Sequence, residues 1–140
     1  MLRSCGFVLS AAALLAVGCG STLYLRVDGR SAGPPVEAFE CVKGRLTVLG
    51  YVQTSIDVES HRITARRYDP EARYADSRFR RRVERLTIEI ESSAGGGARL
   101  RIDAHTFAEL ATLRGPTEVE QDASPGVRAA AQSLLEACGT

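Results

Sequence analysis

The stretch RVERLTIEIES, residues 82–92, decides the fold class, because its apolar and polar side chains alternate. Leu86, Ile88 and Ile90 fall on one side of an extended chain, and the intervening threonine and glutamates fall on the other. Alternation with a period of two is typical of a β-strand that has one buried face. The stretch therefore predicts a strand that covers one side of a hydrophobic core.

The same pattern returns after a glycine-rich turn. Residues 93–97 read SAGGG, and residues 98–106 read ARLRIDAHT, whose apolar side chains again share one face. We therefore predict an antiparallel pair of strands joined by this turn. On the outer face, two glutamates of the first strand can oppose two arginines of the second: Glu89, Glu91, Arg99 and Arg101. Such pairs stabilise a sheet by roughly a few tenths of a kcal/mol each, and they favour a solvated face over a charged binding site.

Two shorter stretches upstream alternate in the same way. Residues 51–58 and 62–68 predict a second hairpin, because polar residues that favour a turn separate them. Residues 105–124 leave two interpretations open, since their apolar residues fit either an extension of the last strand or a helical turn. The sequence therefore predicts four strands.

A helical pattern lies on each side of the strands. Apolar residues recur every three or four positions in 36–49 and again in 127–138. Pro35 precedes the first run, and Ser124 with Pro125 precedes the second, as is typical of helix N-termini. The prediction is an α+β fold: a four-stranded antiparallel sheet with an N-terminal and a C-terminal helix packed on one face.

The first 18 residues predict a secretory signal rather than part of the fold. Arg3 supplies a positive charge, residues 7–17 are almost entirely apolar, and small residues follow. The apolar run is shorter than the roughly 20 residues that a membrane-spanning helix needs. Residues 15–19 read LAVGC. This resembles the lipobox of bacterial lipoproteins, with Ala16 where leucine is more usual.

The resemblance implies that Cys19 carries the lipid anchor. Signal peptidase would cleave before it, diacylglycerol would modify its thiol, and its new amino group would be acylated. Several chains on one residue bind a membrane far better than one chain does. In Gram-negative lipoproteins the next residue helps to sort the product, and here it is Gly20 rather than an aspartate that retains it in the inner membrane. The resemblance implies an outer-membrane lipoprotein whose domain faces the periplasm.

The expected organisation is a signal peptide at 1–18, a lipidated cysteine with its tether at 19–35, and a small periplasmic domain at 36–140. Glycine and proline mark the tether, although residues 23–27 could add a short edge strand. Fully extended, a tether of this length reaches about 50 Å. Without Arg3 the chain has equal numbers of basic and acidic side chains. A neutral domain gives no net field that would attract nucleic acid, so we expect no nucleic-acid partner.

Cys41 and Cys138 are the two cysteines that remain in the predicted mature domain. An even count in an oxidising compartment predicts a disulfide between them. A catalytic thiol is the alternative, and it would need a nearby base such as His61 or His105. Neither histidine lies in a recognisable nucleophile or metal-ligand motif. We therefore predict a disulfide, no metal and no cofactor.

Segment 73–85 is the densest in charge and supplies candidate anion-binding residues, because guanidinium groups pair with phosphate oxygens. The candidates are Arg78, Arg80, Arg81, Arg82 and Arg85. The alternative is a solvated connection between strands, since four acidic residues lie close enough to neutralise much of the charge.

The sequence favours a non-catalytic binding or assembly module at the envelope membrane, with an envelope protein as its partner. Two alternatives remain open. One is a module that binds an envelope lipid or glycan through segment 73–85, and the other is an enzyme whose site is assembled from scattered residues.

Overall fold

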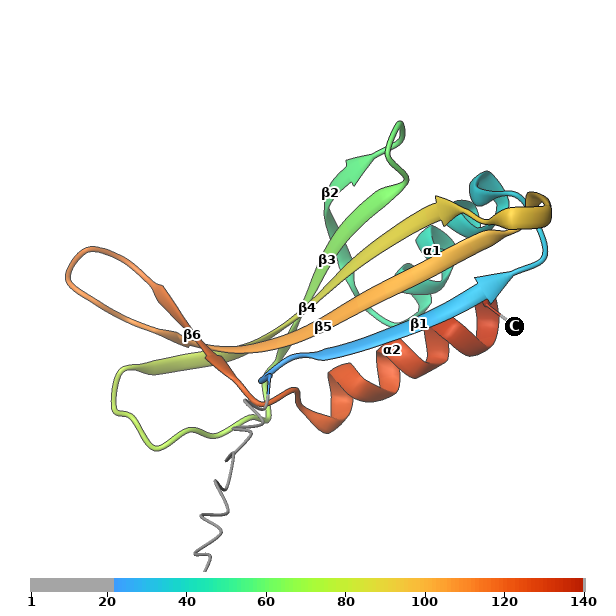
Figure 1. Cartoon of the computed structure of the whole chain (residues 1–140). Helices are drawn as coiled ribbons and strands as arrows, with labels where there is room; N and C mark the ends of the chain where they lie inside the picture. Colours follow the sequence, from blue (N-terminus) through green and yellow to red (C-terminus); the bar gives the residue numbers. More distant parts are fainter. Residues whose placement is uncertain (1–21, 140) are drawn as a thin grey trace, which may run out of the picture.

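The computed structural model describes residues 22–139 as a six-stranded sheet with two helices on one face (Figure 1). In chain order the elements are β1 (Leu25–Ser31), α1 (Pro35–Val48), β2 (Val52–Asp57), β3 (Arg62–Asp69), β4 (Phe79–Ser92), the short 3-10 turn η1 (Ala94–Gly96), β5 (Ala98–Leu110), β6 (Thr117–Gln121) and α2 (Pro125–Cys138). The strand order is β1-β5-β4-β3-β2, β6 pairs with β5, and every pairing is antiparallel. The α+β class is confirmed.

The long hairpin of β4 and β5 forms the centre of the sheet. Its register pairs Glu89 with Arg101 and Glu91 with Arg99, as the alternation predicted. The inward face is buried: Leu86, Ile88, Leu100 and Ile102 have no exposed surface. The turn between the strands contains Gly95 and Gly96, both with positive φ, which is a conformation that glycine adopts without strain.

The prediction of four strands was wrong, because β1 and β6 also belong to the sheet. β1 pairs with β5 from Leu25 opposite Ala104 to Ser31 opposite Ala98, and it lies in the expected tether segment, where the sequence left a short edge strand open. Gly29 stands at an inward position of β1, where a Cβ would lie only 2.5 Å from Leu135 of α2. Because α2 packs this closely, the position holds glycine, and the alternation of apolar and polar residues that predicts a strand is interrupted there. β6 is exposed along most of its length and joins the sheet through its backbone.

Both predicted helices are present. Ser124 caps α2 by accepting a hydrogen bond from the backbone N–H of Val127 at 3.2 Å. α1 begins at Pro35 without a side-chain cap. The helices bury a stripe each against the sheet, and their completely buried side chains are Val42, Leu46, Val127, Ala131 and Leu134.

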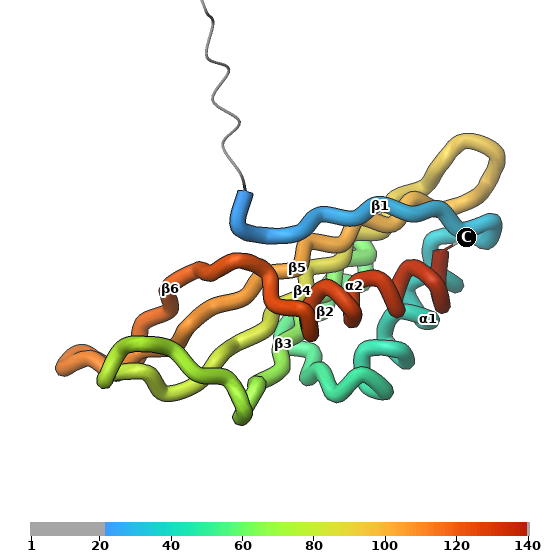
Figure 2. The backbone as a smooth tube through the Cα atoms, turned by 90° about the horizontal axis from the view of Figure 1, so that it is seen from below, coloured from blue at the N-terminus to red at the C-terminus, as the bar shows by residue number. Residues whose placement is uncertain are grey.

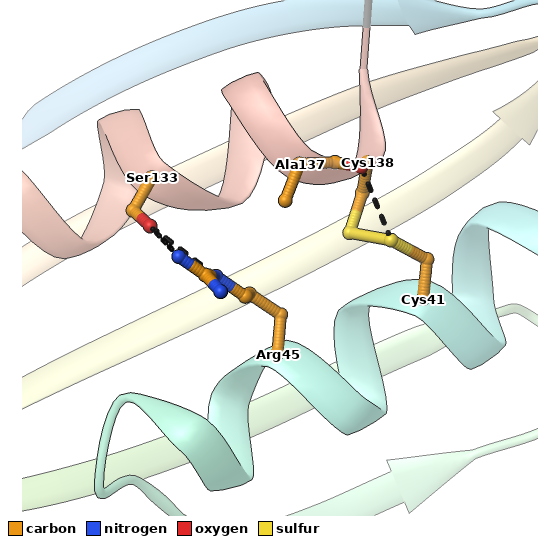
Figure 3. Close-up of a disulfide and its surroundings, with 5 residues drawn as sticks. All are labelled: Cys41, Arg45, Ser133, Ala137 and Cys138. Atoms are coloured by element: carbon orange, nitrogen blue, oxygen red, sulfur yellow. Dashed lines mark hydrogen bonds between the residues drawn. A yellow bond between two sulfur atoms is a disulfide. The ribbon is translucent and has the colours of Figure 1, made fainter.

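A disulfide joins the two helices, as predicted (Figure 3). The Cα atoms of Cys41 and Cys138 lie 5.7 Å apart, although the two residues are 97 positions apart in sequence. One turn further along α1, Arg45 donates a hydrogen bond of 3.0 Å from Nη2 to the hydroxyl of Ser133 on α2. The disulfide and this hydrogen bond therefore join the two helices at points one helical turn apart.

One end of the sheet extends beyond the helices. Figure 2 shows that β6, the β5–β6 turn and the connection between β3 and β4 lie past the start of α2. β1 and β6 lie along the same edge of β5, one after the other. The start of β1 pairs with Ala104, and the end of β6 pairs with Thr106. The predicted signal peptide and Cys19 lie outside the described residues.

Candidate functional site

A pocket of about 550 Å³ opens between the first turn of α2 and the end of β3. Residues 67–70 line it from the end of β3, and Arg82 and Glu84 line it from β4. Ser124, which caps α2, and the first two residues of that helix complete the lining. The pocket lies on the helix-covered face where α2 begins, so it marks the boundary between the covered sheet and its extension.

Glu84 is the most deeply buried charged residue of the pocket, with 2% of its surface exposed. Its Oε2 accepts hydrogen bonds from Arg67 Nε at 2.9 Å and from the Tyr51 hydroxyl at 3.1 Å. Its Oε1 accepts one from the Ser124 hydroxyl at 2.7 Å. A buried carboxylate is tolerated when its charge is paired and its oxygens are hydrogen-bonded. Glu84 therefore joins β4, β3 and the start of α2 through polar contacts.

Arg67 and Tyr51 complete this cluster from the other side. Arg67 Nη1 donates to the carbonyl oxygen of Leu49 at 2.9 Å, and its guanidinium lies 4.6 Å from the centre of the Tyr51 ring. Burial raises the pKa of Tyr51 well above its ordinary value, and the negative charge of Glu84 raises it further. The tyrosine therefore stays protonated and acts as a hydrogen-bond donor.

Gly126 allows the helix to approach this carboxylate. A Cβ at this position would lie 2.6 Å from Glu84 Oε1 and 3.3 Å from Arg67 Nη2. The glycine is required for close approach rather than for an unusual backbone conformation.

Arg82 also lines the pocket, and its Nε donates to none of the described residues. Its Nη1 lies 3.4 Å from Asp69 Oδ2. A guanidinium has five N–H donors, so the terminal nitrogens of Arg82 carry donors beyond the contact with Asp69.

The five predicted anion-binding arginines do not form one patch. Arg81 and Arg85 lie on the open face of the sheet, whereas Arg82 points into the pocket. Each of the five has an acidic partner within 4 Å: Arg78 with Asp76, Arg80 and Arg81 with Glu109, Arg82 with Asp69, and Arg85 with Glu118. Anion binding by these residues stays a prediction, with Arg82 as the member that lines a pocket.

The open face carries a layer of stacked rings and arginines. Arg81 lies 3.7 Å from the centre of the Tyr68 ring, and Arg85 lies 4.5 Å from that of Phe107. The ring of His105 stacks on Tyr24 at 4.7 Å between centroids. This layer shields part of the face that the helices leave open.

Both histidines are engaged in contacts within the fold. His105 Nδ1 lies 2.6 Å from a carboxylate oxygen of Glu120. His61 has a positive φ of 49° and packs edge to face against Phe39 at 5.3 Å. Neither histidine lines the pocket at the start of α2.

Sequence reasoning missed Arg67, Glu84 and Ser124 as a cluster, although a signal was present. Glu84 has the same parity in β4 as Leu86, and Arg67 has the same parity in β3 as Ala65. A charged residue in phase with buried ones lies on the core face and needs a partner. Arg67 and Glu84 carry opposite charges on the core face of neighbouring strands, so each is the expected ion-pair partner of the other.

Within residues 22–139, no group of three or more histidine, cysteine, aspartate or glutamate side chains is arranged to hold a metal ion. Among the helices of that same part, none combines the length and the apolar character needed to cross a bilayer.

Comparison with known proteins assigns no family. No protein-family model matches the chain, and the search of curated proteins finds no match.

Proposed function

We propose that the chain is a lipid-anchored envelope lipoprotein whose domain is a non-catalytic binding or assembly module facing the periplasm. One observation supports this most: within residues 22–139, several groups that could perform nucleophilic or acid–base chemistry are used in structural contacts. Cys41 and Cys138 are joined, and His105 is paired with Glu120. The Ser124 hydroxyl donates to Glu84 and caps α2.

The disulfide is consistent with export. Structural disulfides persist in oxidising compartments such as the periplasm and are rare in the cytosol. The lipobox-like residues 15–19 add the anchor, and the acylated Cys19 would bring the domain to a membrane surface.

The anchor is tested by substitution of Cys19. We expect Cys19→Ala to lose the acyl mass and to leave the membrane fraction, whereas the matched variant Cys5→Ala, outside the lipobox, keeps both. Membrane association of Cys19→Ala equal to that of the wild type would contradict a lipid anchor.

The assembly role is tested by crosslinking in intact cells, followed by detergent solubilisation, affinity purification and mass spectrometry. We expect one reproducible envelope protein in stoichiometric amount. Recovery of the chain alone, or with lipid only, would count against an assembly role.

A second candidate function is recognition of an anionic group of an envelope lipid or glycan at the pocket. The guanidinium of Arg82, which lines the pocket beside Asp69, favours it. Phosphate-bearing lipid or lipopolysaccharide should bind more weakly to Arg82→Gln, while Arg85→Gln on the opposite face should bind as the wild type does. Equal binding by the two variants would remove this candidate.

An enzymatic role with His61 or His105 as base is the remaining alternative. It requires that His61→Ala and His105→Ala together abolish the cellular phenotype of the protein. A phenotype that survives the double substitution supports the non-catalytic reading.

A further inference from the structure

The chain between the predicted lipid and the folded domain is very short. The backbone N–H of Ala123 donates to the carbonyl oxygen of Leu23 at 2.9 Å, and the next residue, Tyr24, stacks on His105. The fold therefore holds the chain from Leu23 onward. Leu23 is four positions after Cys19, and four extended residues span at most about 14 Å. Because the domain begins this early, the long tether expected from the sequence is not available, and Leu23 must stay close to the lipid headgroups.

Eight of the nine exposed large apolar side chains of residues 22–139 fall into two groups on opposite sides of the domain, and the ninth, Val36, lies in the first turn of α1. One group lies on the edge strand β2 and next to it: Val48, Val52, Ile56 and Val58. The other lies on the sheet extension and at the chain entry: Leu23, Tyr74, Leu113 and Val119. Figures 1 and 2 show that the described chain begins beside the start of α2, at the base of the sheet extension that carries the second group.

Leu113 is the most exposed member of this group. It lies in the turn between β5 and β6, and its side chain is as exposed as in an extended chain, at 108%. Arg114 follows it directly. In the β3–β4 connection, Tyr74 has the same arrangement, because it is 41% exposed and follows Arg73. Leucine or tyrosine beside arginine suits a membrane interface, where the apolar part enters the acyl boundary and the cation meets lipid phosphates.

We propose that the sheet extension, with Leu113 at the β5–β6 turn and Tyr74 in the β3–β4 connection, is a membrane-contacting surface that lies on the lipid bilayer. The inference rests on the proposed lipid anchor at Cys19. The anchor holds the domain near the bilayer, and these two positions determine which side faces it. The β2–β3 turn then points away from the membrane.

Site-specific quenching by spin-labelled lipid tests this orientation. The acylated full-length product is purified from the expressing cells and reconstituted in vesicles that contain nitroxide-labelled phospholipid. In the proposed mature form the native cysteines are blocked by lipid or by the disulfide, so a new cysteine can be labelled with a fluorophore. Leu113→Cys reports on the proposed contact, and Ser60→Cys in the exposed β2–β3 turn is the matched control.

We expect loss of most of the fluorescence at position 113 and of little at position 60. Equal quenching at the two positions would mean that the domain tumbles freely or lies differently, and it would overturn the proposal. Intact mass and vesicle flotation are measured on the same samples. Absence of acyl groups removes the anchor itself, whereas an acylated, floating protein with equal quenching overturns only the membrane-contacting surface.

A second variant series keeps the label in one place. With the fluorophore on Ser77→Cys, in the exposed β3–β4 connection, Leu113→Met should keep the quenching because it preserves an apolar side chain. Leu113→Asp should lose it, since a carboxylate is repelled from the acyl boundary. Unchanged quenching in Leu113→Asp would overturn the role of Leu113. Protection of this surface by a protein in place of lipid would overturn the choice of occupant.

Discussion

Removing the carboxylate of Glu84 should destabilise the domain more than any surface substitution. The variant Glu84→Leu leaves the Arg67 guanidinium without its buried partner, and it leaves the buried Tyr51 hydroxyl without an acceptor. Breaking a buried ion pair by removing one partner costs about 3–5 kcal/mol. Because the Arg67 side chain keeps 31% of its surface exposed, water compensates part of the loss, so we expect about 3 kcal/mol.

For a domain of this size, about 3 kcal/mol corresponds to a fall in Tm of about 10–15 °C. The assay is thermal and urea unfolding without reductant, so that the disulfide stays intact. Glu91→Leu is the matched control, because Glu91 belongs to the same strand and is exposed. Its free energy of unfolding should change by no more than about 0.5 kcal/mol.

A double-mutant cycle separates the ion pair from general packing. Arg67→Met combined with Glu84→Leu removes both charges, and replacing a whole buried pair by apolar side chains costs far less than breaking it. The double variant should therefore lose less stability than the sum of the two single variants, by at least about 1 kcal/mol. Additive losses, or a loss below about 1 kcal/mol for Glu84→Leu alone, would refute the reasoning.

Three further predictions follow from other contacts. Gly126→Ala should destabilise the domain, because its Cβ would lie 2.6 Å from the Glu84 carboxylate. Gly44→Ala in α1 should stabilise it by about 0.5–1 kcal/mol, because its Cβ would meet nothing within 4 Å and alanine favours a helix. The same unfolding assay compares the two variants. Reduction of the disulfide, or serine in place of both cysteines, should lower the free energy of unfolding by up to about 4–5 kcal/mol, and reductant should have no effect on the serine variant. Hydrogen bonds from Arg78 lower the pKa of Asp76 to about 2, so this ion pair is complete above the ordinary pKa near 3.8 and is lost as pH falls through about 2. An NMR titration of the Asp76 carboxyl should show that midpoint, and Arg78→Gln should return it toward 3.8; an unchanged midpoint in the variant would contradict the cause.

The parts of the fold that the sequence predicted are those with a strong period. β4 and β5 alternate over long stretches, and the cross-strand register of Glu89 with Arg101 follows from that alternation. Both helices have an apolar stripe and a proline at the start. The disulfide followed from the count of cysteines and became geometrically consistent once both helices were placed on one face.

The two strands beyond the predicted four have no comparable period, although the sequence left an edge strand open at 23–27. β1 offers Leu25 and Val27, but its next inward position is Gly29, where α2 packs too closely for a side chain. β6 reads TEVEQ and is mostly exposed, so nothing in its composition separates it from a loop. Its place is set by backbone hydrogen bonding to the free end of β5, and this is tertiary information.

The arginine-rich segment shows how a strand divides a cluster that looks continuous in sequence. Neighbouring residues in a strand point to opposite faces, so Arg81 and Arg82 cannot act together. Arg81 lies over Tyr68 on the open face, and its edge meets Glu109 at 3.2 Å. Arg85 likewise lies over the ring of Phe107 and pairs with Glu118 of β6, so an incoming anion would have to displace both contacts. Arg82 does not belong to this layer, because its side chain lies on the other face of β4 and lines the pocket. Its Nε has no hydrogen-bond partner among the described residues. The density of arginine in the sequence therefore indicates surface pairing for most of the segment, and strand parity singles out Arg82 as the member that lines a pocket.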